Sequence, residues 1–301
     1  MTTMTLQISQ RQTSLRPAAL ARLVVQALLD EVTLTPKPGL VDLRSRGAHT
    51  DLNWALMCDS ACVLQPVFAA LADAGWHASG DDDSLRQQIG RIGRHGEALM
   101  MAATGGVNTH RGAIWALGLL VTAAAQLAAR GVQLAPAALA ARAAALARLP
   151  DRGAPAETGN KGELACRQYQ VGGARGQAMA AFPHVVDVGL PCLRASRARG
   201  DTETTARLNA LLAIIAQLDD TCVLSRGGRA ALLDMQAGAA QVLAAGGAAS
   251  KEGCTALLAL EAQVLELRVS PGGAADLLAA TLFLDRLDSL DNTYGAQHGK
   301  A

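Results

Sequence analysis

The sequence is poor in the residues from which β-strands are built. Only 3% of its 301 residues are aromatic and 18% are charged, whereas alanine and leucine dominate. Strands favour β-branched and aromatic side chains, while alanine and leucine are strong helix formers. We find no sustained strand-like alternation, internal repeat or low-complexity linker. The composition therefore predicts an all-α protein, with residues 1–301 in a single large multi-helix domain.

The sequence also lacks a strong charge imbalance and an apolar leader. The formal net charge is +1, so nothing general favours binding to nucleic acid or a membrane surface. Residues 1–12 lack the apolar segment of a signal peptide, and we expect a cytoplasmic protein. Residues 112–129 carry no charge, but they include Gly118, Thr122 and Gln126. We interpret this stretch as a buried helix rather than a membrane span.

The cysteines do not form a recognisable ligand set. Six are scattered along the chain, and only Cys58 and Cys62 have helical spacing. No second cysteine or histidine pair at zinc-site spacing accompanies them. We expect reduced, mostly buried thiols.

Apolar periodicity and its interruptions by glycine and proline predict the helices. Asp51 is the expected N-cap of the second helix, Gly80–Ser84 a solvated turn, and Asp201 or Thr202 a later N-cap. We expect residues 1–14 and 288–301 to be flexible and residues 151–162 to form a mobile loop. The helices are expected over 15–32, 51–74, 85–103, 112–129, 136–150, 163–171, 175–181, 183–199, 202–218, 228–245, 250–268 and 273–287.

Short punctuated segments lie at the edges of these helices. Each places glycine or proline beside charged or hydroxyl side chains. Glycine lets the backbone approach an anion, and a helix N-terminus carries partial positive charge. Together they predict a phosphate-rich ligand held between helices. The segments are TPKPG (35–39), GGVNTHRG (105–112), DDT (219–221) with RGG (226–228), and SPGG (270–273) before Asp276.

Lys37 is the first candidate ligand of that phosphate. It stands between two prolines, so its backbone is stiff. Glu31, Asp42, His49 and Asp51 flank it. Carboxylates beside a phosphate-binding lysine are reasonable if Mg²⁺ bridges them. The alternative is a rigid turn with solvated charges.

Two further segments allow both a binding and a structural interpretation. Asn108 or Thr109 could simply cap the next helix, but capping does not explain His110 and Arg111 beside an apolar helix. An anionic ligand would be a suitable partner for them. Arg175, among the glycines of GGARG (172–176), could contact phosphate or could mark a simple helix break.

The Asp219–Asp220 pair is expected at the end of a helix, where negative charge opposes the macrodipole. That placement predicts a compensating cation, either a metal ion or Arg226. Ser270 can present its hydroxyl and nearby free amides at the start of the last helix, with Asp276 one turn further on. The alternative for Ser270 is an ordinary capping turn.

Taken together, the segments resemble the triphosphoribosyl-dephospho-coenzyme A synthase family over residues 31–287. The family makes the prosthetic-group precursor of citrate lyase and malonate decarboxylase. The residues 51–75 and FPHVV (182–186) look closer to the malonate decarboxylase branch. The motifs that carry the resemblance are TPKPGLVD (35–42), GAH (47–49) with Asp51, GGVNTHRGAIWALGLL (105–120), GGARG (172–176), DDTCVLSRGG (219–228) and SPGGAADLLAATLFLD (270–285).

The resemblance implies an all-helical enzyme and a Mg²⁺-assisted transfer. ATP loses adenine, and its triphosphoribosyl group joins the 2′-hydroxyl of 3′-dephospho-coenzyme A. A downstream transferase, an acyl carrier protein and a second copy of the chain are possible partners. Two positions depart from the family pattern: Arg111 replaces a lysine that we associate with the citrate branch, and Gln177 replaces a common acid.

The same chemistry gives each candidate residue a role. Cleaving an N-glycosidic bond places positive charge on the ribose, which nearby carboxylates stabilise. Asp219 and Asp220 are the candidates for that role or for deprotonating the accepting hydroxyl. His110 is a candidate acid for adenine departure or a hydrogen-bond donor to phosphate. The candidate substrate- and phosphate-binding residues are Lys37, Asn108, Thr109, Arg111, Arg175, Arg226, Ser270, Gly272 and Gly273, and the candidate magnesium ligands are Glu31, Asp42 and Asp276.

Two other functions fit parts of the pattern. A helical, metal-dependent ADP-ribosyl-type hydrolase would also place paired aspartates beside a nucleotide, with water as the acceptor. A non-catalytic helical scaffold would need none of these side chains for activity. Adenine release without an acceptor would favour the hydrolase.

Overall fold

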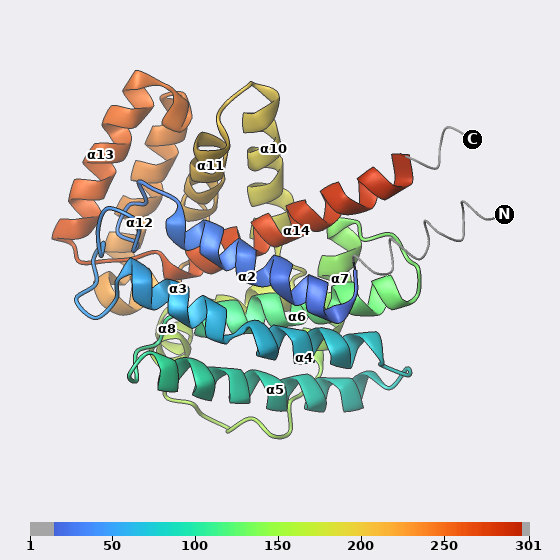
Figure 1. Ribbon diagram of the computed structural model, residues 1–301. Helices are drawn as coiled ribbons and strands as arrows, with labels where there is room; N and C mark the ends of the chain where they lie inside the picture. Colours follow the sequence, from blue (N-terminus) through green and yellow to red (C-terminus); the bar gives the residue numbers. More distant parts are fainter. Residues whose placement is uncertain (1–14, 297–301) are drawn as a thin grey trace.

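The computed structural model describes residues 15–296. Within that range every regular element is helical and no strand occurs, so the all-α prediction is confirmed. The described helices share one hydrophobic core (Figure 1). Their bounds are α2 Pro17–Thr33, α3 Trp54–Val63, α4 Gln65–Trp76, α5 Asp82–Ala103, α6 Arg111–Ala129, α7 Pro136–Arg148, α8 Lys161–Tyr169, α9 Gly173–Met179, η1 His184–Gly189, α10 Leu190–Ala198, α11 Glu203–Ile215, α12 Thr221–Ala244, η2 Gly247–Ala249, α13 Lys251–Glu266 and α14 Gly272–Ala296.

The uncharged helix α6 occupies the centre of the molecule. It contacts α2, α4, α5, α7 and α14. In its most apolar stretch, 78% of the residues are buried. This confirms that the stretch is a core helix. By length and composition, α6 and the segment Trp54–Trp76 are the two described stretches apolar enough to cross a membrane, a test that a buried helix also passes.

Several helix boundaries differ from the predictions because side-chain caps and a proline fix them. Asn53, not Asp51, caps α3 by accepting a hydrogen bond from the main-chain nitrogen of Leu56 at 3.0 Å. The expected single helix then divides at Leu64, since Pro66 belongs to the first turn of α4. Asp81 caps α5, so residues 82–84 are helical rather than a turn.

The later boundaries also differ. The helix expected to reach residue 218 ends at Ile215, and α12 begins at Thr221 rather than at residue 228. Gly228 instead kinks α12, with φ 71° and ψ −169°. The last helix continues past its expected end at residue 287 to Ala296. Flexibility was predicted for residues 1–14 and 288–301. Residues 288–296 are helical, and residues 1–14 and 297–301 lie outside the described range.

All six cysteines are free, which agrees with the expectation of thiols outside disulfides. None of them is fully buried, however, and Cys62 and Cys254 are exposed. The prediction that they are mostly buried is therefore wrong. Alanine and leucine side chains, not thiols, fill the core.

The fold brings the punctuated segments towards one side of the molecule. The loop between α2 and α3 and the first residues of α6, α12 and α14 lie towards the left edge of Figure 1. Side-chain contacts among these segments confirm that they are neighbours, as described below.

Candidate active site

Asp220 joins the N-termini of two helices. Its Oδ1 accepts a hydrogen bond from the main-chain nitrogen of Cys222 at 2.8 Å, and its Oδ2 accepts one from that of Ala274 at 2.9 Å. The side chain is buried, which raises its pKa, while main-chain donors at both helix ends oppose that shift. Asp220 therefore caps α12 and α14 together.

This position corrects the electrostatic argument for the Asp219–Asp220 pair. The pair precedes α12 instead of ending a helix, so the macrodipole favours its negative charge. A compensating cation is not required on that ground. Asp219 is exposed, in contrast to the buried Asp220.

Gly272 and Gly273 allow the two helix ends to meet. A Cβ on Gly273 would lie 3.1 Å from atoms of the Asp220 carboxyl group, and one on Gly272 would lie 3.0 Å from Cys222 Sγ. The two glycines are thus explained by this close approach of α14 to α12.

Asp276 connects α14 with the N-terminus of α6. Its carboxylate accepts a hydrogen bond from the main-chain nitrogen of Ala113, and a Cβ on Gly112 would lie 2.0 Å from its Oδ2. Burial raises the pKa of Asp276 well above its usual value, and the negative charges of Glu31 and Asp220 raise it further. This carboxylate therefore has two carboxylate neighbours, and a bound cation would favour its ionised form.

Lys37 and Glu31 form a buried ion pair. Lys37 Nζ lies 2.5 Å from Glu31 Oε1 and also donates to the Glu31 main-chain oxygen at 2.6 Å. The two side chains are 1% and 5% exposed. The structure thus pairs a predicted phosphate ligand with a predicted metal ligand, and each balances the charge of the other.

Asp42 organises the loop between α2 and α3. Its oxygens accept hydrogen bonds from the Thr35 hydroxyl at 2.8 Å and from the main-chain nitrogens of Lys37, Arg44 and Ser45 at 3.1, 2.7 and 2.9 Å. Burial raises the pKa of Asp42, but these bonds outweigh it and the pKa is lowered overall. The carboxylate is therefore charged and already supplied with donors.

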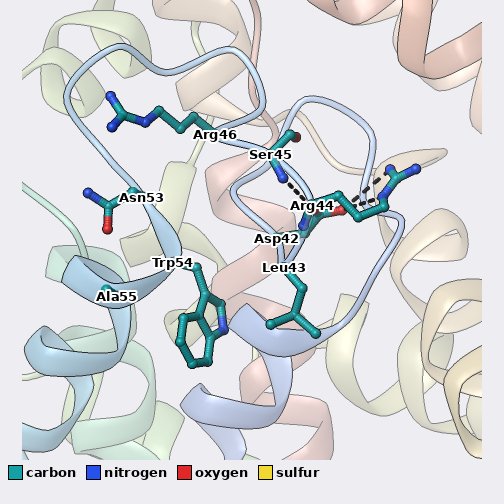
Figure 2. A pocket seen from close by; sticks show the side chains of 8 residues that line it. All are labelled: Asp42, Leu43, Arg44, Ser45, Arg46, Asn53, Trp54 and Ala55. Carbon is teal, nitrogen blue, oxygen red and sulfur yellow. Dashed lines mark hydrogen bonds and ion pairs between the residues drawn. The ribbon is translucent and has the colours of Figure 1, made fainter.

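A cavity of about 260 Å³ opens beside this loop (Figure 2). Arg44 is tied to Asp42 and to Glu261, with 2.8 Å between Arg44 Nη2 and Glu261 Oε1. Arg46, in contrast, has no side-chain ion pair with any described residue. The lining of the cavity thus combines the Arg46 guanidinium with the exposed apolar side chains of Leu43 and Trp54. Its lining residues are Asp42, Leu43, Arg44, Ser45, Arg46, Asn53, Trp54 and Ala55.

His110 lies buried at the start of α6. Its Nδ1 is 2.9 Å from Ser60 Oγ, which in turn is 2.6 Å from Thr109 Oγ1, while Nε2 has no hydrogen-bond partner. Burial, with a smaller effect of the Lys37 charge, lowers the pKa of His110 to about 4. The imidazole is therefore neutral at pH 7 and can donate or accept only one hydrogen bond at each nitrogen.

The other residues of the same segment have partners within the protein. Asn108 Oδ1 accepts a hydrogen bond from the main-chain nitrogen of Arg111 at 3.2 Å, but the N-cap position of α6 is His110 rather than Asn108 or Thr109. Arg111 Nε lies 3.0 Å from Glu97 Oε2. The partner that Arg111 requires at this apolar helix is therefore supplied by α5.

Arg226 and Arg175 have different charged neighbours. Arg226 is an exposed residue of α12, and its positive charge lowers the pKa of His49 in the α2–α3 loop. Arg175 is exposed on α9, and its positive charge contributes to lowering the pKa of Arg86. The GGARG segment reaches the junction through Gly173, whose Cβ would lie 3.4 Å from Thr221 Cγ2.

Ser270 contacts a residue that was not among the predicted site residues. Its Oγ lies 2.9 Å from His49 Nε2, although 221 positions separate the two residues in the sequence. Gly39 permits this contact, because a Cβ there would lie 2.5 Å from the main-chain oxygen of Val269. The α2–α3 loop therefore packs directly on the start of α14.

These contacts define a class of protein. It is an all-α protein in which the candidate catalytic and binding side chains lie where the N-termini of α6, α12 and α14 meet the α2–α3 loop. Helix N-termini suit anionic substrates. Within the described residues, no three histidine, cysteine, aspartate or glutamate side chains are arranged as a preformed metal site. A metal ion would therefore depend on oxygen ligands from a substrate as well.

Sequence comparison identifies the family. Residues 17–294 match the family model described as ATP:dephospho-CoA triphosphoribosyl transferase, and the chain belongs to that family. It is therefore an enzyme of the triphosphoribosyl transferase type.

Curated relatives agree with this assignment. The chain is 58% identical to a 2-(5''-triphosphoribosyl)-3'-dephosphocoenzyme-A synthase of Klebsiella pneumoniae, over 90% of this chain and 95% of that protein. It is 57% identical to a probable synthase of the same name from Azotobacter vinelandii, over 90% of this chain and 91% of the relative. No solved structure matches the chain.

Proposed function

We propose that this enzyme transfers the triphosphoribosyl group of ATP to the 2′-hydroxyl of 3′-dephospho-coenzyme A and releases adenine. The family and the names of the relatives support this reaction over hydrolysis by an ADP-ribosyl-type enzyme. The structural observation that carries the proposal is the junction at Asp220, which joins α12 to α14 beside the α6 N-terminus. Because the carboxylates of Asp220 and Asp276 already take donors at these helix ends, the triphosphate would be bound there together with Mg²⁺.

The positions of the arginines suggest how the phosphates are bound. Arg226 and Arg175 are exposed and could contact phosphate oxygens, while Arg46 adds a free cation at the cavity of Figure 2. Lys37 would act at a distance, because Glu31 already neutralises it. We keep Asn108, Thr109, Arg111, Ser270, Gly272 and Gly273 as candidate binding residues.

Mg²⁺ would neutralise phosphate charge when it enters with ATP. We assign this role to Asp276, whose ionised form is disfavoured by burial and by the charges of Glu31 and Asp220 and would be restored by a bound cation. Asp42 suits the role less well, because protein donors already occupy its oxygens. The exposed Asp219 is the better placed of the aspartate pair to stabilise positive charge on the ribose.

We further propose that the product is the prosthetic-group precursor for the acyl carrier subunit of malonate decarboxylase. The resemblance of residues 51–75 and 182–186 to that branch supports it over the citrate lyase branch. A cytoplasmic location, a downstream transferase or acyl carrier partner, and a homodimer are parts of the same proposal. Loading of the product onto each of the two carrier proteins by its own transferase would distinguish the branches.

The reaction is tested by incubating the protein with ATP and Mg²⁺, with and without 3′-dephospho-coenzyme A. Mass spectrometry should detect adenine and the triphosphoribosylated coenzyme in equal amounts, both dependent on the acceptor. Adenine released at the same rate without the acceptor would establish hydrolysis instead. Absence of both products would contradict any transfer from ATP.

A further inference from the structure

His49 lies between a hydroxyl group and a carboxylate. Its Nε2 faces Ser270 Oγ at 2.9 Å, and its Nδ1 faces Asp51 Oδ1 at 3.7 Å. Ser270 is buried, whereas the Asp51 side chain is 60% exposed. The buried hydroxyl therefore fixes the ring from one side, and the His49 side chain, which is 12% exposed, lies next to the more exposed Asp51.

The charged groups around His49 keep the imidazole able to accept a proton. Burial lowers its pKa, the Arg226 charge from α12 lowers it further, and Asp51 of the same loop partly opposes them. The ring is therefore mostly neutral at pH 7. If Nε2 carries its proton towards Ser270, Nδ1 presents a free lone pair.

Two of the predicted catalytic residues are less suitable as the general base. Asp220 accepts hydrogen bonds from two helix ends and is buried, so its oxygens are not free to take a substrate proton. His110 is buried as well, and its Nδ1 contacts Ser60. His49 combines a neutral ring, partial exposure and a nearby carboxylate, which are the properties of a general base.

We propose that His49 is the general base for the accepting hydroxyl, with Ser270 and Asp51 as its positioning residues. This inference rests on the proposed function. The hydroxyl O–H bond breaks and its proton passes to His49 Nδ1, while the oxygen forms a bond to C1 of the ribose of ATP. The C1–N9 bond breaks, and its electron pair leaves with adenine, which takes up one proton from water. Asp51 stabilises the resulting imidazolium, which then returns its proton to water.

The test uses His49→Gln, Asp51→Asn and Ser270→Ala in the full chain, assayed with saturating ATP and varied 3′-dephospho-coenzyme A. We expect His49→Gln to lower kcat by on the order of 10²-fold or more, since general base catalysis contributes that much. The matched control is His77→Gln, because His77 Nδ1 also lies near a carboxylate, 3.2 Å from Asp73 Oδ1, on an exposed surface. This control should retain the wild-type kcat.

The pH dependence separates catalysis from folding. The wild-type rate should fall as pH decreases through the His49 pKa, because the imidazolium cannot accept a proton. His49→Gln should lose this acidic limb, and Asp51→Asn should move it to lower pH, since Asp51 raises that pKa. Ser270→Ala should lower kcat, and an accompanying rise in the KM for ATP would report its separate candidate role in binding phosphate.

The outcomes are distinguishable. If the wild type forms no coupled product, the proposed function itself fails. If the wild type forms it and His49→Gln keeps both its rate and its acidic limb, the general base is another group. Should His49→Gln fail to fold, the exposed Asp51→Asn decides, because an unshifted limb in that variant contradicts the inference.

Discussion

The carboxylate of Asp220 and the main-chain nitrogen of Ala274 are joined by a 2.9 Å hydrogen bond across 54 positions of sequence. The other oxygen of Asp220 caps its own helix through Cys222. The Asp220 side chain thus holds the N-terminus of α12 next to the N-terminus of α14. The geometry of the candidate active site depends on that connection.

Asp220→Asn should therefore destabilise the fold. The amide nitrogen would face one main-chain donor, and leaving a buried donor unsatisfied costs about 1–3 kcal/mol. Urea unfolding would measure the change. Asp219→Asn is the matched control at an exposed position, and we expect it to alter stability by less than about 0.5 kcal/mol. Equal effects of the two substitutions would contradict the capping role.

Lys37→Met should be strongly destabilising, because it leaves the Glu31 carboxylate buried without its partner. Breaking such a pair costs about 3–5 kcal/mol, whereas replacing both partners by apolar residues is often neutral. The double variant Lys37→Met, Glu31→Leu should regain most of the loss in a denaturation experiment. Arg152→Ala, which breaks an exposed pair with Asp83, should cost less than about 1 kcal/mol. A Lys37 effect as small as this one would argue against a buried pair.

Gly112→Ala should disrupt the contact between α6 and α14, because the added Cβ would lie 2.0 Å from Asp276 Oδ2. We expect a lower melting temperature and at least a tenfold loss of transferase activity, since the Asp276 carboxylate must move. The matched control is Gly93→Ala in α5, where no atom lies within 4 Å of the new Cβ. That control should be neutral or stabilising by up to about 1 kcal/mol. A fully active Gly112→Ala enzyme would show that the close packing is unimportant.

His110 should make stability depend on pH. Its pKa is about 4 in the folded protein and 6.5 ordinarily, so the unfolded chain binds more protons between these values. The free energy of unfolding should decrease as pH falls from 6.5 to 4, by at most about 3 kcal/mol from this group. His110→Asn should lack that part of the slope when unfolding is compared at pH 7 and pH 4.5. Identical slopes for both proteins would mean that His110 is not buried in neutral form.

The sequence was sufficient to predict the fold class and the most regular helices. The absence of charge in α6 and the proline at the start of α7 identified two helices within a residue or two of their bounds. The start of α12 was missed because Gly228 looked like a helix boundary. In the structure the helix continues through Gly228 with a kink at that residue. Local pattern does not reveal that Asp220 is an N-cap until the chain beyond it is known to be helical.

The site was predictable as a set of segments rather than as a set of contacts. The TPKPG, DDT and SPGG segments do meet, but the pairing of Lys37 with Glu31 and the saturation of Asp42 depend on folded geometry. His49 was named beside Lys37 but was given no catalytic role for the same reason, since its partner Ser270 is remote in sequence. A signal was present: His49 and Asp51 lie two positions apart in a glycine-containing loop.

The location of the ATP site is the central claim and can be measured by photolabelling with 8-azido-ATP followed by peptide mapping. We predict labelled peptides from residues 34–53, 105–112, 219–228 or 270–276, with labelling suppressed by excess ATP. The competing location is the cavity of about 520 Å³ between α4 and α5, which is lined by Pro66, Val67, Ala70, Gln88, Arg91, Ile92, His95 and Leu99. ATP-suppressible labelling confined to that cavity would contradict a nucleotide site at the helix junction.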